Sequence, residues 1–197
     1  MKFDQVLYGV ALEVRSSIEN EEGTVIEEEV SMEQNLIVRG VAFEKGMTRL
    51  TILGLNNELN GLSSIFTVLA DHQIDVDIII QSQTDTNKTN LSFSIKTKDL
   101  DNVIEVLEQH RQEIGYEGLE HEAELAKVSI VGSGMVSNPG VAARMFQILA
   151  KKQIQVKMVS TSEIKISVVV NEDQMELAAQ TLHEEYDLGA VPAEATN

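Results

Sequence analysis

Residues 127–132 read Lys-Val-Ser-Ile-Val-Gly, and residues 49–54 read Arg-Leu-Thr-Ile-Leu-Gly, 78 positions earlier. The matches continue downstream, now at an offset of 80. They pair residues 66–70 with 146–150, Ile74 with Ile154, Val76 with Val156, and Ser82 with Ser162. Because the matched pieces keep their order and a nearly constant spacing, we interpret the chain as two copies of one structural unit.

Each copy predicts the same order of elements. An alternating apolar run that ends in Gly indicates a strand, and a polar turn follows it. Helical spacing of apolar residues comes next, at Leu62, Ile65, Phe66, Leu69 and Ala70, and again at Ala142, Met145, Phe146 and Leu149. Two β-rich runs follow, residues 75–83 and 90–97 in the first copy, and 155–160 and 164–170 in the second. A second helix closes each copy, with Leu100, Val103, Val106 and Leu107, and with Met175, Ala178, Ala179 and Leu182.

This order is one strand short of the ferredoxin-like βαββαβ unit. The first copy finds a fourth strand at residues 118–124, but the second copy has none of its own. The apolar run at residues 36–43 has no place in the first copy. We therefore hypothesise an α+β fold of two ferredoxin-like βαββαβ domains, the first inserted within the second. The predicted boundaries are 47–125 for the first domain and 34–46 plus 126–189 for the second, followed by a flexible tail at 190–197.

Composition narrows the class of protein. The chain has 197 residues and a formal net charge of −17, so phosphate backbones and anionic lipid are disfavoured partners. We expect no nucleic acid and no membrane among its partners. Cysteine is absent, which excludes a disulfide framework and a thiolate metal site. The first residues show no apolar core of a signal peptide, so the expected location is the cytoplasm.

Motifs for catalysis and cofactor binding are missing. The four His residues (72, 110, 121 and 183) are widely spaced in sequence and favour surface or helix-end positions over a metal site. Neither a Gly-x-x-x-x-Gly-Lys-Ser/Thr loop nor a Gly-x-Gly-x-x-Gly fingerprint occurs. Nothing pairs a nucleophile with a base. We expect no catalytic residues, no metal and no cofactor in this chain.

Two polar turns that open helices are the candidate binding features. The turns end at Asn60-Gly61 and Pro139-Gly140, and free N–H groups at a helix start bind carboxylate well. Plain helix capping by Asn60 or Asn138 is the alternative interpretation. On the facing strand, Asp77 can accept an ammonium group and Gln81 can bind a polar side chain. A carboxylate at the first helix start and an ammonium at Asp77 together describe an α-amino acid.

Several of these stretches carry a family resemblance. Residues 127–142, 159–167 and 35–43 closely resemble the C-terminal region of aspartate kinase, and each copy resembles an ACT domain, an amino-acid-sensing module. The resemblance covers about residues 14 to 189 and implies the nested order proposed above. Some members of the family produce this region as a separate β subunit that starts at an internal Met, and Met32 is the natural equivalent.

The front of the chain resembles other parts of the same family. Residues 14–18 and 22–26 resemble the end of the kinase domain, and residues 1–8 resemble an earlier kinase segment. We interpret residues 1–31 as a remnant of that domain. The family's ATP and aspartate motifs are absent, so we do not expect phosphoryl transfer from this chain alone. ATP is implied only if another chain supplies a kinase domain.

The resemblance also implies which residues bind the effector. They lie at the first turn, on the strand after the first helix, and at matching places in the second copy: Asn56, Asn57, Leu59, Asn60, Gly61, Leu62, Asp77, Gln81, Gln153, Gln155, Val156 and Ser162. In the family these surfaces meet across a homodimer. The residues at positions 57, 59, 60 and 155 depart from those of lysine- and threonine-sensing relatives, so lysine, threonine or both stay open as the effector.

The resemblance therefore implies a regulatory subunit or fragment of aspartate kinase, which binds lysine, threonine or both for feedback control of amino-acid biosynthesis, with a catalytic aspartate kinase chain as its partner. One alternative is an ACT dimerisation module that binds no ligand. Another is a shortened aspartate kinase, which would turn over ATP with aspartate.

Overall fold

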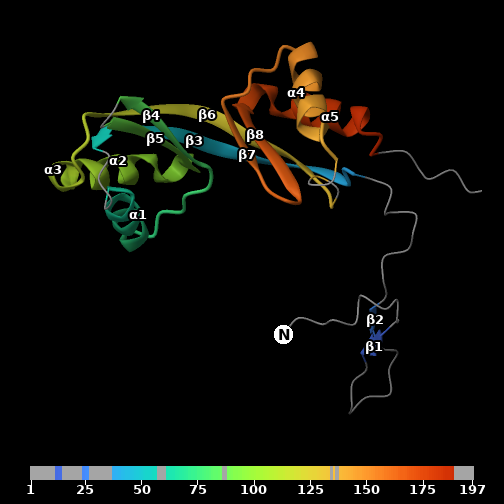
Figure 1. The fold of residues 1–197 in the computed structure, drawn as a ribbon, viewed down its shortest axis with the longest axis horizontal. Coiled ribbons are helices and arrows are strands. Elements are labelled where there is room, and N and C mark those ends of the chain that lie inside the picture. Colours follow the sequence, from blue (N-terminus) through green and yellow to red (C-terminus); the bar gives the residue numbers. More distant parts are fainter. Residues whose placement is uncertain are drawn as a thin grey trace, which may run out of the picture. The chain divides into compact units, whose positions relative to one another are not determined.

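The computed structural model describes residues 12–14, 24–26, 37–56, 61–85, 88–133, 135 and 138–188 (Figure 1). The chain divides into two units, Met1–Ile37 and Val38–Asn197. In the first unit, β1 (Leu12–Val14) pairs antiparallel with β2 (Thr24–Ile26). The predicted kinase remnant at 1–31 lies outside the described residues apart from these two strands, and so do Met32 and the predicted tail.

The second unit is built on one antiparallel sheet of six strands in the order β4-β5-β3-β6-β8-β7. The strands are β3 (Gly40–Asn56), β4 (Ile79–Asp85), β5 (Lys88–Lys96), β6 (Gly118–Val131), β7 (Met158–Thr161) and β8 (Lys165–Asn171). The strands predicted from the repeat are therefore present. The first β-rich run starts later than predicted, because residues 75–78 precede β4 and only Ile79 onward joins the ladder with β5.

The two central strands are longer than the sequence predicted. We expected separate strands at 36–43 and 49–54, but β3 begins at Gly40 and continues to Asn56. Likewise, the strands expected at 118–124 and 127–132 form one strand, β6. Continuity is possible because each strand carries a bulge. β3 places residues 45–46 opposite Ala126, and β6 places residues 123–124 opposite Thr48.

The pairing of β3 changes along its length. Residues 40–44 pair with the end of β6, where Gly40 lies opposite Val131 and Glu44 opposite Lys127. Residues 47–56 pair with β5 on one side and with the start of β6 on the other. The same end of β6 pairs with β8 on its other edge. The strand that begins the described sheet thus lies beside the strands of the second copy.

Helices cover the two halves of the sheet separately (Figure 1). The first half carries α1 (Gly61–Asp71), α2 (Leu100–Gln109) and the short α3 (Arg111–Ile114). The second half carries α4 (Val141–Lys151) and α5 (Met175–Glu185). In α4 the buried residues are Val141, Met145, Ile148 and Leu149. The predicted Ala142 is only partly buried and Phe146 is exposed, because the buried face is turned slightly from the predicted one.

Two cores and a small cluster between them hold the unit together. The first core contains Leu50, Ile52 and Phe93 together with the buried faces of α1 and α2. The second contains Val128, Val168 and the buried faces of α4 and α5. A junction cluster at the centre of the sheet consists of Met47, Ile78, Leu125, Met158 and Val169. Met47 lies directly opposite Leu125 in the β3–β6 ladder, so the halves are joined by packing as well as by hydrogen bonds.

The bulge in β3 depends on Gly46, which has a φ of +72°. A side chain in this left-handed region is strained, even though nothing lies within 4 Å of a Cβ added there. We expect Gly46→Ala to lower the free energy of unfolding by about 1–2 kcal/mol, measured by urea denaturation. Gly40→Ala is the matched control, because Gly40 also has open space around it but no left-handed φ. Equal effects of the two substitutions would contradict this account.

Candidate functional site

The start of α1 is the first predicted binding feature. Asn56 ends β3 opposite Lys88, and Gly61 is the first residue of α1. Leu62 is 37% exposed, so the helix start faces solvent. The turn between them lies outside the described residues, and with it the predicted site residues Asn57, Leu59 and Asn60.

Asp77 occupies a different place from the one predicted. It lies just before β4 and not within it, although its backbone N–H donates to the carbonyl of Ser94 at 3.1 Å. Its carboxylate is about half exposed and accepts a hydrogen bond from the ammonium of Lys127. Gln81 does lie in β4, where it is exposed opposite Leu91. Both side chains are therefore accessible to a ligand.

Within one chain, however, Asp77 and the start of α1 lie at opposite ends of the first half. Asp85 at the far end of β4 pairs with Lys88, and Lys88 pairs with Asn56. At about 3.3 Å per residue, the run from Asp77 to Asp85 is roughly 25 Å long. A single α-amino acid cannot span this length. The two predicted contacts therefore form one site only if a second surface approaches each of them.

The predicted residues of the second copy also separate into two places. Gln153, Gln155 and Val156 precede β7, and Gln153 has a left-handed φ of 58°. Ser162 follows β7, roughly 20 Å further along the extended chain. Within one chain, β7 therefore separates Ser162 from Gln153–Val156, so their proximity stays a prediction for a site that two chains share.

Ser162 instead lines a groove of about 280 Å³ at the start of α4. The other polar parts of its lining come from Thr161 and from the turn at Asn138, Pro139 and Gly140. Gly140 is the N-cap residue, and the N–H of Val141 donates to the backbone carbonyl of Asn138 at 3.4 Å. Tyr186 holds the helix start in place, because its hydroxyl donates to the carbonyl of Val141 at 3.0 Å. The groove suits a carboxylate in the way predicted from sequence.

Around Asp77, four charged side chains form a cluster that we call the Asp77 cluster: Glu44, Asp77, Lys96 and Lys127. Lys127 binds the carboxylate of Asp77 and that of Glu44, the latter at 3.0 Å. Lys96 also binds Glu44. Hydrogen bonds from Lys96 and Lys127 hold the pKa of the Glu44 carboxyl below its ordinary value. Burial lowers the pKa of the Lys127 ammonium, but its interactions with Asp77 and Glu44 outweigh burial and raise that pKa above its ordinary value.

An equivalent cluster, which we call the Glu122 cluster, lies further along the same two strands: Arg49, Glu122 and Lys157. Glu122 binds Arg49 and Lys157, each at 2.7 Å. The sequence repeat aligns Arg49 with Lys127 and Asp77 with Lys157. Sequence reasoning missed both clusters, although the alignment of the two copies contained the signal. A basic residue occurs at both members of the first aligned pair, whereas the charge changes from negative in Asp77 to positive in Lys157.

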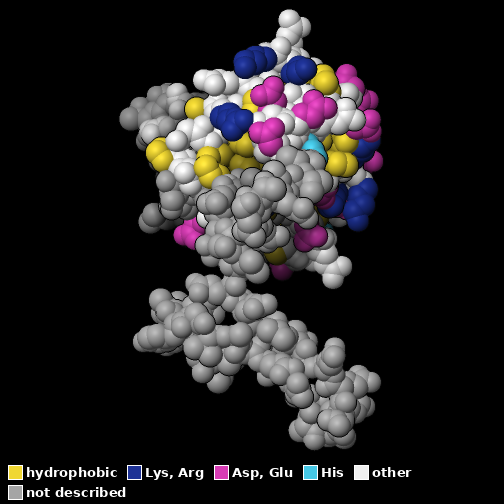
Figure 2. Space-filling model, turned by 90° about the vertical axis from the view of Figure 1, so that its right-hand side faces the viewer, with side chains coloured by type: hydrophobic (Ala, Val, Ile, Leu, Met, Phe, Trp, Pro, Cys, Tyr) yellow, Lys and Arg dark blue, Asp and Glu magenta, His cyan; other side chains and the backbone are white. Residues whose placement is uncertain are grey.

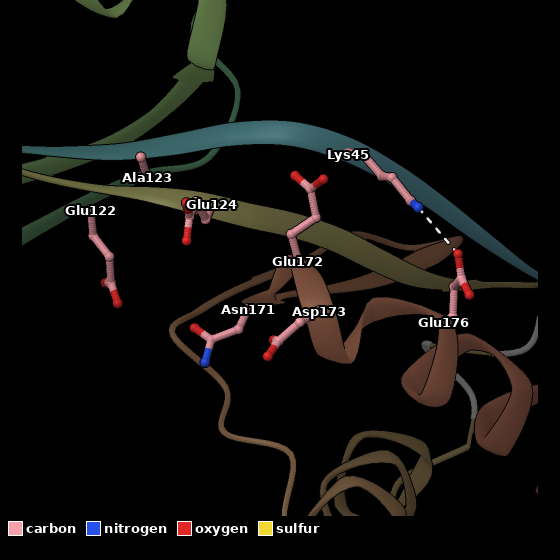
Figure 3. Close-up of a pocket in the computed structure, with 8 residues that line it drawn as sticks. All are labelled: Lys45, Glu122, Ala123, Glu124, Asn171, Glu172, Asp173 and Glu176. Atoms are coloured by element: carbon pink, nitrogen blue, oxygen red, sulfur yellow. Dashed lines mark hydrogen bonds and ion pairs between the residues drawn. The ribbon is translucent and has the colours of Figure 1, made fainter.

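A groove of about 770 Å³ lies where the two halves meet (Figure 3). Its charged lining comes from β3, β6, α5 and the turn η3 (Glu172–Gln174): Lys45, Glu122, Glu124, Glu172, Asp173 and Glu176. Lys45 pairs with Glu176 at 3.2 Å, and the N–H of Gly46 donates to Glu172 at 3.0 Å. Acidic side chains also recur across the surface in Figure 2. This groove repels a carboxylate, so it is not a site for an amino acid's acid group.

Metal binding has no support in the described part of the chain, where no group of three or more His, Cys, Asp and Glu residues could hold an ion. The rings of His72 and His110 come within 6.4 Å of each other, although the two residues are distant in sequence. Each ring makes a hydrogen bond through Nδ1 to a carbonyl of its own helix, which agrees with the predicted helix-end role. Among the described helices, none is long and apolar enough to cross a bilayer.

Comparison with known proteins identifies the family. A family model described as an ACT domain matches residues 128–186. The chain is 64% identical over 181 residues to aspartokinase of Bacillus sp. (strain MGA3), and 59% identical over 186 residues to aspartokinase 2 of Bacillus subtilis (strain 168). Among solved structures, this chain is 38% identical to a chain in the crystal structure of aspartokinase alpha and beta subunits, with a TM-score of 0.71. The match covers 77% of this chain and 99% of that one. This chain belongs to the aspartokinase family.

The match is to the regulatory region of aspartokinase. The match with the Bacillus sp. relative covers 92% of this chain but only 44% of the relative. The match with the Bacillus subtilis relative covers 94% of this chain and 45% of the relative. By contrast, it covers 97% of the regulatory subunit of aspartate kinase from Thermus thermophilus in its ligand-free form, using 75% of its own residues at 33% identity and a TM-score of 0.69. The mixed α/β structure with an antiparallel sheet is thus the ACT regulatory fold of aspartokinases, as the resemblance in sequence implied.

Proposed function

We propose that this chain senses amino acids for an aspartokinase: it binds lysine, threonine or both in the cytoplasm and conveys inhibition to a catalytic aspartokinase chain. The observation that carries the proposal is the nearly complete coverage of a separate regulatory subunit. Two features of the site support it. The starts of α1 and α4 offer places for a carboxylate, and the half-exposed Asp77 offers an acceptor for an ammonium.

Isothermal titration calorimetry with L-lysine and L-threonine, singly and together, tests this proposal. We expect saturable heat with at least one of them. N-acetyl-lysine, which keeps the side chain and carboxylate but loses the α-ammonium, is the matched control and is expected to bind much more weakly. Absence of heat from folded protein at millimolar ligand would favour the alternative of an ACT module that binds no effector.

The nested order of the two domains is part of the same proposal. The half of the sheet at residues 47–56 has the order β4-β5-β3-β6, and the half at residues 40–44 has the order β3-β6-β8-β7. Each is the strand order of one βαββαβ unit, and β3 and β6 contribute one end to each unit. This arrangement supports a first ACT domain inserted within the second.

We also propose that the effector site is completed by a second copy of the chain. The support is that Asp77 and the start of α1 lie at opposite ends of β4 within one chain, where the run from Asp77 to Asp85 is roughly 25 Å long. The edge strands offer surfaces for a homodimer, because Ile79 in β4 and Val159 in β7 are 50% and 37% exposed. Analytical ultracentrifugation should show a dimer whose dissociation constant falls when effector is added. A monomer that binds effector at full affinity would overturn this arrangement.

A catalytic partner completes the proposed function. No phosphate-binding loop occurs in residues 1–197, so these residues are not expected to turn over ATP, and a kinase domain has to supply that activity. When this chain is mixed with a catalytic aspartokinase chain, we expect lysine or threonine to inhibit phosphorylation of aspartate. ATP turnover with aspartate by the pure chain would instead support a shortened aspartokinase.

A further inference from the structure

The two charge clusters offer a comparison within a single molecule. Both are built on the same pair of strands, where Glu44 lies opposite Lys127 and Glu122 lies opposite Arg49 in the β3–β6 ladder. In each cluster the paired strand residues point away from the nearby core, because strand side chains alternate and their neighbours Val128 and Leu50 face the second and the first core. The clusters are therefore equivalent in backbone position and in the cross-strand ion pair that each contains.

They differ in the third member. In the Glu122 cluster it is a base, since Lys157 binds the shared acid Glu122 at 2.7 Å. In the Asp77 cluster it is an acid, since Asp77 binds the shared base Lys127. Of the two clusters, only the Asp77 cluster has an acid as its third member, and in the described structure the partner of that acid is the ammonium of Lys127.

Lys127 is well placed to compete with a ligand. Its side chain is only 16% exposed, whereas that of Asp77 is 48% exposed. A ligand can therefore approach Asp77 from solvent, while Lys127 reaches it from the protein side. If an ammonium takes over Asp77, Lys127 keeps its pair with Glu44 at 3.0 Å. The exchange consequently leaves no partly buried cation without a counter-ion, which would be costly.

We propose that Lys127 sets the affinity of the effector site: its ammonium occupies Asp77 in the ligand-free chain and is exchanged for the ammonium of the bound amino acid. This inference rests on the proposed function. It also gives binding a route to the second half, because Lys127 lies in β6 directly before Val128, a residue of the second core. Release of Lys127 changes the contacts of a strand that both halves share.

Calorimetry on the full chain with Lys127→Met tests the proposal, with L-lysine and L-threonine as probes. Methionine keeps the length of the side chain but removes the competing charge. We expect binding to tighten about fivefold, the upper end of what an ion pair with one half-exposed member contributes. Arg49→Met is the matched control at the equivalent position of the repeat, and it should leave the affinity within about twofold, since it leaves Asp77 and Lys127 paired.

The outcomes separate this inference from the proposed function. If the wild type binds an effector and Lys127→Met binds it equally or more weakly, the inference is overturned and the proposed function stands. Weaker binding would mean that Lys127 contacts the ligand's carboxylate. No binding by either protein overturns the proposed function and the inference with it.

A second measurement does not depend on the folding of the methionine variant. In wild-type chain labelled with ¹⁵N at lysine Nζ, saturating effector should move the Lys127 resonance and leave that of Lys157 in place. Lys127→Arg, which keeps the charge, serves to assign the signal. A Lys127 resonance that ignores bound effector contradicts the exchange.

Discussion

Phe93→Ala is expected to lower the free energy of unfolding by about 3–5 kcal/mol. Phe93 is completely buried in the first core, where its ring packs edge to face against Phe66 at a centroid distance of 6.1 Å. Truncation removes the buried ring and leaves a cavity that the surrounding β strands and α1 cannot close, because β5 is fixed between β3 and β4.

Urea denaturation followed by far-ultraviolet circular dichroism measures this effect. Phe146→Ala is the matched control, because Phe146 is the repeat equivalent of Phe66 but is 37% exposed. Its substitution should cost about 1 kcal/mol or less. A loss below about 1 kcal/mol for Phe93→Ala would show that the first core is not packed as described.

The same substitution is expected to destabilise both halves together. β3 and β6 each run through both halves, and the junction cluster packs across the boundary between them. Tyr116 belongs to the first core and Tyr186 packs against the second, so each reports on one half. In Tyr186→Phe the near-ultraviolet signal reports on Tyr116, and in Tyr116→Phe it reports on Tyr186. We therefore expect the near-ultraviolet transitions of the two variants to have the same urea midpoint. Two separate transitions would mean that the halves fold independently.

Asp77→Asn is expected to weaken effector binding about 10- to 100-fold. Asparagine preserves the shape of the side chain but removes the negative charge that an ammonium needs. The folded state should lose little stability, because Asp77 is about half exposed and Lys127 keeps Glu44 as a partner. The variant therefore separates recognition of the ligand from folding.

Calorimetry with the amino acid that binds the wild type gives the affinity, and a thermal melt confirms that the variant is folded. Asp75→Asn is the control, because Asp75 is an exposed carboxylate two positions upstream on the same segment. It should change the affinity by less than about twofold. Unchanged binding in Asp77→Asn would place the ammonium partner elsewhere in the site.

Much of the fold was predictable, because the spacing of apolar residues within a short segment indicates a helix or a strand. Helix spacing marks α1, α2, α4 and α5, and the alternating runs mark the strands. Their boundaries were less certain. Residues 75–78 have the composition of a strand, yet they precede β4, because a ladder needs a partner and β5 pairs with β4 only from Ile79 onward.

The candidate site was only partly predictable, because a local sequence pattern does not give the distance between two residues in the folded chain. The turn before α1 and Asp77 were both found from residue chemistry, but their separation along β4 depends on the register of three strands. The partner of Asp77 was missed for a similar reason. Lys127 lies 50 positions away and reaches Asp77 only because β6 crosses the sheet beside β3.

By itself, the sequence indicated two copies of one unit, predicted which elements each contains, and identified Asp77 in the first copy as an acceptor for an ammonium. The tertiary structure decided that β3 and β6 are each continuous through both halves, since bulges at Gly46 and Glu124 keep the ladder in register where a break was expected. It also decided that Lys127 pairs with Asp77, because long-range pairing places these charges together. The physical reason is that hydrophobic periodicity acts within a few residues, whereas register and ion pairing are fixed only when distant strands meet.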